Sequence, residues 1–248
     1  MKYIVACITL SALFSCSTKD PVTPIVTQNQ SISLQWSAVV GGKEAKVNHY
    51  YHMKDGDSIL FNRLDFYIQA PVFKNKAGLS AKLDTVFLFS DKNLTQSLSL
   101  KSSELPLTID SIRFLAGIDD LKNQLDPNSF DPDHPLSSYK QMYWTMGTKY
   151  RYIVMEGNIK TSGGALIQYS FHTGLRYKYF ADVPVNLVLN PNGVNSYKIK
   201  FNIDRLFYPL LGSKIDYKNG ETQAHGDAAH AALTDKVALN FAKAFSVE

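Results

Sequence analysis

The feature that most constrains the fold of this chain is a repeated alternation of apolar and polar residues. Short runs of this kind, bounded by Gly, Pro, Asn and Asp, recur along residues 31–203, and a period of two is typical of strands with one buried face. The alternation predicts a mainly β domain, folded as an antiparallel β-sandwich or a barrel-like sheet. The strands are expected at 31–36, 60–69, 82–89, 150–159, 165–173, 183–189 and 196–203.

Two segments interrupt the alternation. Residues 119–125 predict a short helix or turn, and they lead into a long loop rich in aspartate and proline that reaches Pro135. A loop of this length in a compact domain is more often functional than idle. Near the C-terminus, apolar residues recur every four positions from Ala229 to Phe245, which predicts an amphipathic helix over 227–245 that packs on the sandwich.

The N-terminus has the composition of a bacterial export signal. Lys2 precedes an apolar run over 3–14 that is too short to span a bilayer. The run ends in Leu-Phe-Ser-Cys, which resembles the cleavage box of bacterial lipoproteins; the alternative is an ordinary signal peptide with a chance cysteine. We therefore expect a lipoprotein signal peptide over 1–15, a flexible tether over 16–30 that begins at a lipidated Cys16, and one β domain over 31–248.

The cysteine count limits the chemistry of the mature chain. There are two cysteines, and Cys7 lies in the segment that would be removed. We therefore expect no disulfide, no cysteine-based metal motif and no cysteine nucleophile in the mature domain, so a metal site must use His, Asp, Glu, Met or backbone oxygen. The formal charge is +4, with basic residues scattered among acidic ones, which gives no support to nucleic-acid binding.

Sequence motifs of enzymes are lacking. The chain has no Gly-x-Ser-x-Gly elbow, no phosphate-binding glycine loop with lysine and no His-Glu-x-x-His helix. Ser162-Gly163-Gly164 predicts a hairpin turn. The aspartate-rich loop lacks the glycine and the glutamate of an EF-hand, so it predicts a structured turn in preference to a calcium site. We expect no enzymatic activity, although a carboxylate pair for glycoside hydrolysis stays open.

Histidines are the remaining candidates for metal ligands. The spacing of His49 and His52 places them on opposite faces of a strand. His225 and His230 are five residues apart, which turns them off a common helix face. Neither pair makes a self-contained site. The chain has six histidines: His49, His52, His134, His172, His225 and His230.

A series of short motifs resembles the MbnP-like family of periplasmic or surface copper-binding proteins. The match spans nearly the whole mature domain. The motifs are Phe114-Leu-Ala-Gly-Ile-Asp119, Asp131-Pro-Asp-His-Pro-Leu136, Met142-Tyr-Trp144, Met155-Glu-Gly157 and Phe171-His-Thr-Gly174, flanked by Arg63-Leu-Asp-Phe-Tyr67 and Asn240-Phe-Ala-Lys-Ala-Phe245.

The resemblance implies copper bound by histidines next to a tryptophan that some members oxidise to kynurenine. By position it makes His134 and His172 the metal ligands, with His225 or His230 as a third ligand, and Trp144 the aromatic neighbour. Imidazole suits copper, and two neutral imidazoles can bind Cu(I) in near-linear fashion. The chain departs from the family pattern at Met146, where a second tryptophan is common. If that position carries the oxidised residue, no kynurenine forms here, and Met146 offers a thioether instead.

These observations favour a copper-binding lipoprotein of a Gram-negative envelope, anchored in the outer membrane and facing the periplasm or the cell surface. It would act in copper acquisition, storage or handover without catalytic turnover. The resemblance implies an outer-membrane transporter or a di-haem peroxidase-like protein as partner. The alternative is a non-metal β-sandwich lipoprotein that binds a partner protein or a glycan.

Overall fold

The computed structural model of the protein describes residues 30–91, 95–102, 105–145, 147, 149–190 and 193–248. The expected signal peptide, Cys16, nearly all of the tether and Met146 lie outside these residues. No helix within the described ranges has the length and apolar character needed to cross a membrane.

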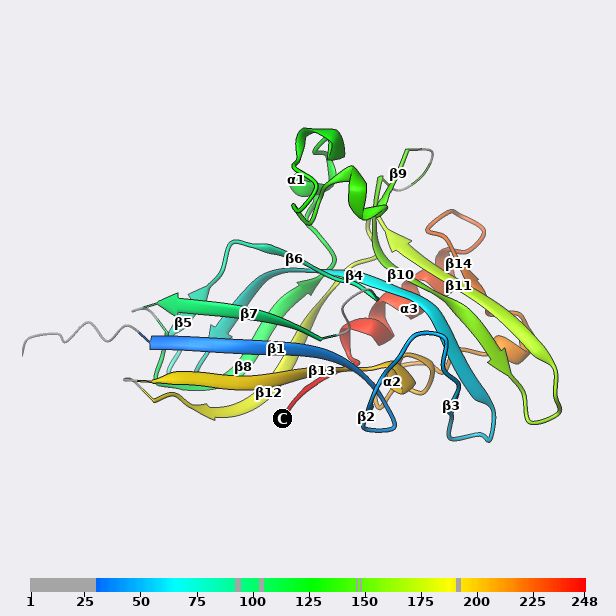
Figure 1. Ribbon diagram of the computed structural model, residues 1–248, viewed down its shortest axis with the longest axis horizontal. Coiled ribbons are helices and arrows are strands. Elements are labelled where there is room, and N and C mark those ends of the chain that lie inside the picture. Colours follow the sequence, from blue (N-terminus) through cyan, green and yellow to red (C-terminus); the bar gives the residue numbers. More distant parts are fainter. Residues whose placement is uncertain (1–29, 92–94, 103–104, 146, 148, 191–192) are drawn as a thin grey trace, which may run out of the picture.

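Two curled sheets form the fold (Figure 1). The smaller sheet is built around β1 (Gln30–Val40), and its other strands are β2 (Lys43–Glu44), β7 (Thr95–Ser102), β13 (Val194–Asn202) and β15 (Phe245–Val247). The larger sheet has the order β12 (Tyr179–Val188), β8 (Thr108–Ala116), β4 (Ser58–Lys74), β10 (Lys149–Lys160), β11 (Leu166–Gly174) and β14 (Gln223–Ala224). Short strands pair with β4 or β10: β3 (Tyr51–His52), β5 (Ser80–Lys82), β6 (Val86–Phe89) and β9 (Tyr143–Trp144).

The predicted mainly β, sandwich-like architecture is confirmed, with two exceptions to antiparallel pairing. β1 runs parallel to β13, and β14 runs parallel to β11. Every other pairing among the described strands is antiparallel. The parallel pairs join segments far apart in the sequence, so local periodicity could not have predicted them.

Most expected strands are present, but the one over 82–89 is divided. β5 and β6 pair with different parts of β4, on either side of a bend at Ala70, whose φ is +51°. A register shift in the β4–β8 pairing marks the same bend. β7 and β8 were not predicted.

The C-terminal helix is shorter than the expected 227–245. α3 spans Ala231–Ala242, and residues 225–230 form a turn before it. Phe245 belongs to β15, where it pairs with Phe201 of β13. The helix therefore ends because the chain joins the smaller sheet, while the Phe245 side chain remains in the core. The other α-helices are α1 (Asp120–Asn123) and α2 (Ile203–Phe207).

Aromatic side chains fill the main core between the sheets and α3. The ring of Phe66 on β4 stacks on Phe89 at 4.6 Å between centroids, and it meets Phe241 of α3 at 4.9 Å and Phe201 at 5.3 Å. All four side chains are buried, and each contributes about 2 to 3 kcal/mol by leaving water. The helix is thus part of the core.

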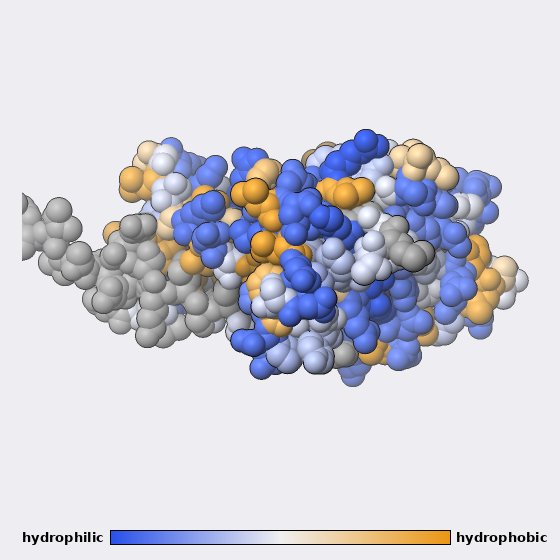
Figure 2. Space-filling view, turned by 90° about the horizontal axis from the view of Figure 1, so that it is seen from above, coloured by the Kyte–Doolittle hydropathy of each residue, from blue (hydrophilic) through white to orange (hydrophobic). Residues whose placement is uncertain are grey.

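A second, smaller core fixes the aspartate- and proline-rich loop on the outer face of the larger sheet. Tyr67 donates a hydrogen bond to the Pro135 carbonyl (3.0 Å), and Tyr150 donates one to the Leu136 carbonyl (2.8 Å). α1 and this loop project from one side of the molecule next to β9 (Figure 1). Seen from that side, the surface is mostly hydrophilic with small hydrophobic groups between (Figure 2). The long loop is therefore an ordered part of the domain.

Candidate metal centre

Three histidines and a tryptophan meet at one edge of the larger sheet. His172 lies on β11, on the face opposite the main core. Because β14 runs parallel to β11, the residue that follows β14, His225, lies beside His172. His230 directly precedes α3, and Trp144 ends β9, which pairs with β10.

The ring distances allow a shared metal ion. The ring centroids of His172 and His225 are 5.2 Å apart, and those of His225 and His230 are 5.4 Å apart. Trp144 lies edge-on to His172 and to His225, at 6.4 Å from each. Bonds from metal to imidazole are about 2 Å long, so the centres of two rings on one ion lie up to about 6 Å apart. His172 and His225 are within that limit.

His172 is held in place by a carboxylate. Its Nε2 atom lies 2.7 Å from Oε1 of Glu156 on β10 and 3.2 Å from the Ser170 hydroxyl. The side chain is 13% exposed. Burial lowers the pKa of His172, and the hydrogen bond with Glu156 only partly opposes this. The imidazole is therefore favoured in its neutral form, which is the form that binds metals.

His225 has a ring nitrogen that is free to bind a metal ion. Its Nδ1 atom is buried and has no hydrogen-bond partner among the described residues. Burial lowers the pKa of His225, and the neighbouring His230 lowers it further. A buried nitrogen without a partner costs free energy unless something binds it. His225 therefore fits a metal ligand.

A pocket of about 300 Å³ opens onto these side chains. The indole of Trp144, which is 37% exposed, forms part of its wall. In the described part of the chain, no three His, Cys, Asp or Glu side chains are already arranged around a metal position. The spacing of the His172 and His225 rings is compatible with a shared ion, whereas His230 does not line the pocket and must reorient to reach it. The pocket is lined by Tyr143, Trp144, Arg151, His172 and His225.

His134 lies apart from this cluster. Its ring stacks on Phe130 at 4.1 Å between centroids, and its Nδ1 atom accepts a hydrogen bond from the Leu136 amide (3.1 Å). No ring contact or hydrogen bond between His134 and either His172 or His225 exists in the described ranges. The structure thus brings together His172, His225 and Trp144, and leaves His134 within its own loop.

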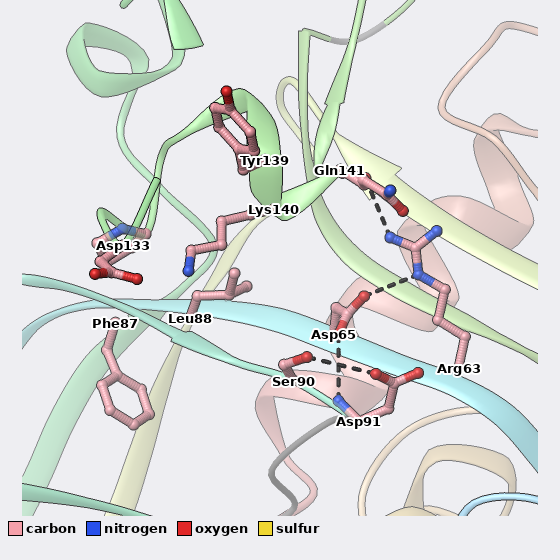
Figure 3. A pocket seen from close by; sticks show the side chains of 11 residues that line it. Arg63, Asp65, Phe87, Leu88, Ser90, Asp91, Asp133, Tyr139, Lys140 and Gln141 are labelled. Carbon is pink, nitrogen blue, oxygen red and sulfur yellow. Dashed lines mark hydrogen bonds and ion pairs between the residues drawn. The ribbon is translucent and has the colours of Figure 1, made fainter. Parts of the chain in front are cut away.

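A larger cavity of about 580 Å³ lies between β4, β6 and the long loop (Figure 3). Asp133 and Lys140 lie toward one end, and Arg63 and Asp65 toward the other. The ring of Tyr139, which is 72% exposed, stands at the rim. The cavity offers charged groups of both signs beside an exposed aromatic ring.

Two guanidinium groups stand between the cavity and the histidine pocket. Arg63, which lines the cavity, donates to the Gln141 carbonyl at 3.1 Å, and Arg151, which lines the pocket, donates to the same oxygen. The Arg151 Nε atom is buried without a partner among the described residues. Burial lowers the pKa of Arg151, and the charge of Arg63 adds to this.

Sequence reasoning missed two carboxylates at the site. Glu156 bonds His172, and Asp227 bonds the Nδ1 atom of His230 at 2.9 Å. The Met155-Glu-Gly157 motif and the hairpin at Ser162-Gly163-Gly164 contained the signal for Glu156, because strands joined by a tight turn have a fixed register. No such signal existed for Asp227, because the helix was expected to begin there.

Comparisons with known proteins agree on one family. The family model described as MbnP matches residues 29–226. Among solved structures, MbnP from Methylosinus trichosporium is similar, with 10% sequence identity and a TM-score of 0.55, over 88% of this chain and 98% of that chain. No curated protein sequence matches the chain. At this identity the structural likeness concerns the fold.

Proposed function

This chain belongs to the MbnP family, and on that premise we propose that it binds copper through His172 and His225, in the pocket beside Trp144. The observation that carries the proposal is the buried Nδ1 atom of His225, which has no hydrogen-bond partner among the described residues. The ring of His225 lies 5.2 Å from that of His172, a second imidazole that is largely shielded from water. Imidazole nitrogens suit copper, and a pair of them suits Cu(I).

The surroundings of the two histidines favour the uptake and release of copper over catalysis of a reaction. The pocket is small, and its walls are aromatic and imidazole rings together with one guanidinium group. Copper is accordingly the cargo of this protein, which acquires, stores or hands over the ion without catalytic turnover. Arg151, whose Nε atom is buried, lines the pocket beside the histidines and adds positive charge. This disfavours Cu(II) more than Cu(I), because Coulomb repulsion scales with the charge of the ion.

The cellular setting is part of the same proposal. The N-terminal sequence supports an envelope lipoprotein anchored through Cys16 in the outer membrane of a Gram-negative bacterium, facing the periplasm or the cell surface. An outer-membrane transporter or a di-haem peroxidase-like protein would then receive or deliver the ion.

The test is an anaerobic titration of the purified protein with Cu(I) against a competing chelator. We expect one ion per chain, and affinity reduced at least about 100-fold in His172→Ala and in His225→Ala. His134→Ala is the matched control and should bind copper like the unaltered protein, because its ring packs on Phe130. Equal affinity in all four proteins, or no binding by the unaltered one, would refute the proposal.

A second candidate function rests on the cavity of Figure 3. An exposed tyrosine beside carboxylates and cationic groups suits a glycan, whose hydroxyls accept and donate hydrogen bonds while an apolar sugar face stacks on the ring. A panel of soluble neutral oligosaccharides, followed by NMR chemical shifts, tests this. Glycan binding should shift resonances around the cavity and be lost in Tyr139→Ala; a panel without any effect would exclude it.

A further inference from the structure

Two of the three clustered histidines are each bonded to a carboxylate through one ring nitrogen. Glu156 lies 2.7 Å from Nε2 of His172, and both carboxylate oxygens of Asp227 lie 2.9 Å from Nδ1 of His230. An ionised carboxylate only accepts hydrogen bonds, so each of these nitrogens must carry the proton. In a neutral imidazole the other nitrogen then holds the lone pair.

The strand order places His172 between its carboxylate partner and a second histidine. β11 lies between β10 and β14, with Glu156 on β10 and His225 immediately after β14. The two nitrogens of an imidazole ring point in widely different directions. Because Glu156 occupies Nε2, the atom that His172 can offer to an ion is Nδ1. The neighbouring ring of His225, 5.2 Å away between centroids, has a buried Nδ1 atom without a partner among the described residues.

His230 stands on the far side of His225. Its ring centroid is 5.4 Å from that of His225, and its side chain is 36% exposed, so the ring has room to reorient. Asp227 also accepts a hydrogen bond from the backbone amide of His230 (3.0 Å), which fixes the turn before α3. Because Asp227 occupies Nδ1, the atom that His230 can offer to an ion is Nε2.

We propose that Glu156 and Asp227 are positioning residues that fix the tautomers of His172 and His230, and that His230 is the third copper ligand. The ligating atoms are Nδ1 of His172, Nδ1 of His225 and Nε2 of His230. This inference rests on the proposed function, because it names the donor atoms of the same site. Carboxylates that bond to ligating histidines in this way raise ligand basicity and hold the ring orientation.

The metal-free protein tests the tautomers directly. Long-range 1H–15N NMR spectra should show His172 protonated at Nε2 and His230 protonated at Nδ1. Glu156→Ala should give a mixture of tautomers at His172, whereas Glu156→Gln, which keeps an acceptor oxygen, should preserve the Nε2–H form. Asp227→Ala should release His230 in the same way. Asp182→Ala, which removes an exposed carboxylate paired with Arg113, is the control and should change neither histidine.

Copper titration of the same proteins completes the test. Glu156→Ala and Asp227→Ala should each lower affinity about 10- to 100-fold, the usual effect of removing such a partner, and His230→Ala should lower it at least as much as Asp227→Ala. If the unaltered protein binds copper but Glu156→Ala keeps the tautomer of His172, or His230→Ala keeps full affinity, this inference is overturned and the proposed function is not. Absence of copper binding by the unaltered protein would overturn the proposed function and the ligand assignment with it.

Discussion

A buried carboxylate at Asp57 ties the segment that carries His225 to the larger sheet. Asp57 is fully buried in the turn between β3 and β4. It accepts hydrogen bonds from Lys218 (2.8 Å), from the Tyr217 hydroxyl (2.9 Å) and from the Ser162 amide of the β10–β11 hairpin (2.8 Å). Tyr217 and Lys218 belong to the 3-10 helix η3 (Tyr217–Asn219), just before β14 and His225. Asp57 therefore joins three separate segments.

We expect Asp57→Asn to reduce stability in a pH-dependent way. Burial alone would raise the pKa of Asp57, but the hydrogen bonds from Lys218, the Ser162 amide and Tyr217 outweigh it and lower the pKa from 3.8 to about 2. This difference corresponds to about 2 kcal/mol of folding free energy at pH 7. Because the folded pKa is the lower one, the contribution is complete above pH 3.8 and disappears as the pH falls from 3.8 toward 2. At pH 3 about 1 kcal/mol of it remains.

The assay is urea unfolding of both proteins at pH 7 and pH 3. The stability difference between the unaltered protein and Asp57→Asn should be about 2 kcal/mol at pH 7 and about 1 kcal/mol smaller at pH 3. Because the other carboxylates titrate alike in both proteins, their effect on stability cancels in this difference. Asp182→Asn, which alters an exposed ion pair with Arg113, should show no pH-dependent difference. A difference for Asp57→Asn that is the same at both pH values would refute the electrostatic explanation.

Three further predictions concern the site and its support. Gly157→Ala should lower the free energy of unfolding by about 3 kcal/mol or prevent folding, because a Cβ there would lie 2.0 Å from the Leu60 carbonyl oxygen. Gly163→Ala is the control and should be tolerated, because the nearest atom to its Cβ would be 3.8 Å away. Equal melting temperatures of the two variants would contradict this. Apparent copper affinity should stay level from pH 8 to 6.5 and fall only below, because burial lowers the pKa of His172 and of His225 from 6.5 and protons compete with the ion only below the folded pKa; a decline already above pH 6.5 in competition titrations would count against it. Binding of Cu(I) should change tryptophan fluorescence in the unaltered protein but not in Trp144→Phe, since this indole lies 6.4 Å from two of the imidazoles; a change that persists in the variant would place the ion elsewhere.

The sequence was sufficient for the fold class and the family, because both depend on local patterns. Alternation on β4, β10 and β11 follows from one face of each strand meeting the core, and the resemblance to the MbnP-like family rested on short motifs that the family model bears out. β7 was not predicted because it consists mostly of Ser, Thr, Gln and Lys, which do not favour a strand. Its strand conformation comes from its pairing with β1.

The site was harder to predict because its parts meet through non-local pairing. His225 reaches His172 through β14, a strand of two residues that pairs in parallel with β11. A five-residue spacing would separate His225 and His230 on a helix, but the chain turns between them and their rings lie 5.4 Å apart. His134 was placed by the family motif alone, and its ring instead packs on a residue four positions earlier in its own loop.

Glu156, in contrast, could have been predicted. The hairpin at 161–165 pairs Lys160 with Leu166, and counting back along both strands places Val154 opposite His172 and Glu156 opposite Ser170. Glu156 is then the diagonal neighbour of His172 on the same face, within reach of its ring. A turn motif combined with strand register thus identifies the carboxylate partner of a histidine from the amino-acid sequence.

Copper K-edge X-ray absorption of the loaded protein tests the central claim most directly, because it reports the atoms bound to the ion. We expect imidazole nitrogen ligands at about 2 Å, with the outer-shell scattering of imidazole rings reduced in His172→Ala and in His225→Ala and unchanged in His134→Ala. A spectrum without imidazole scattering, or one identical in all four proteins, would contradict copper binding at the site formed by β11 and β14.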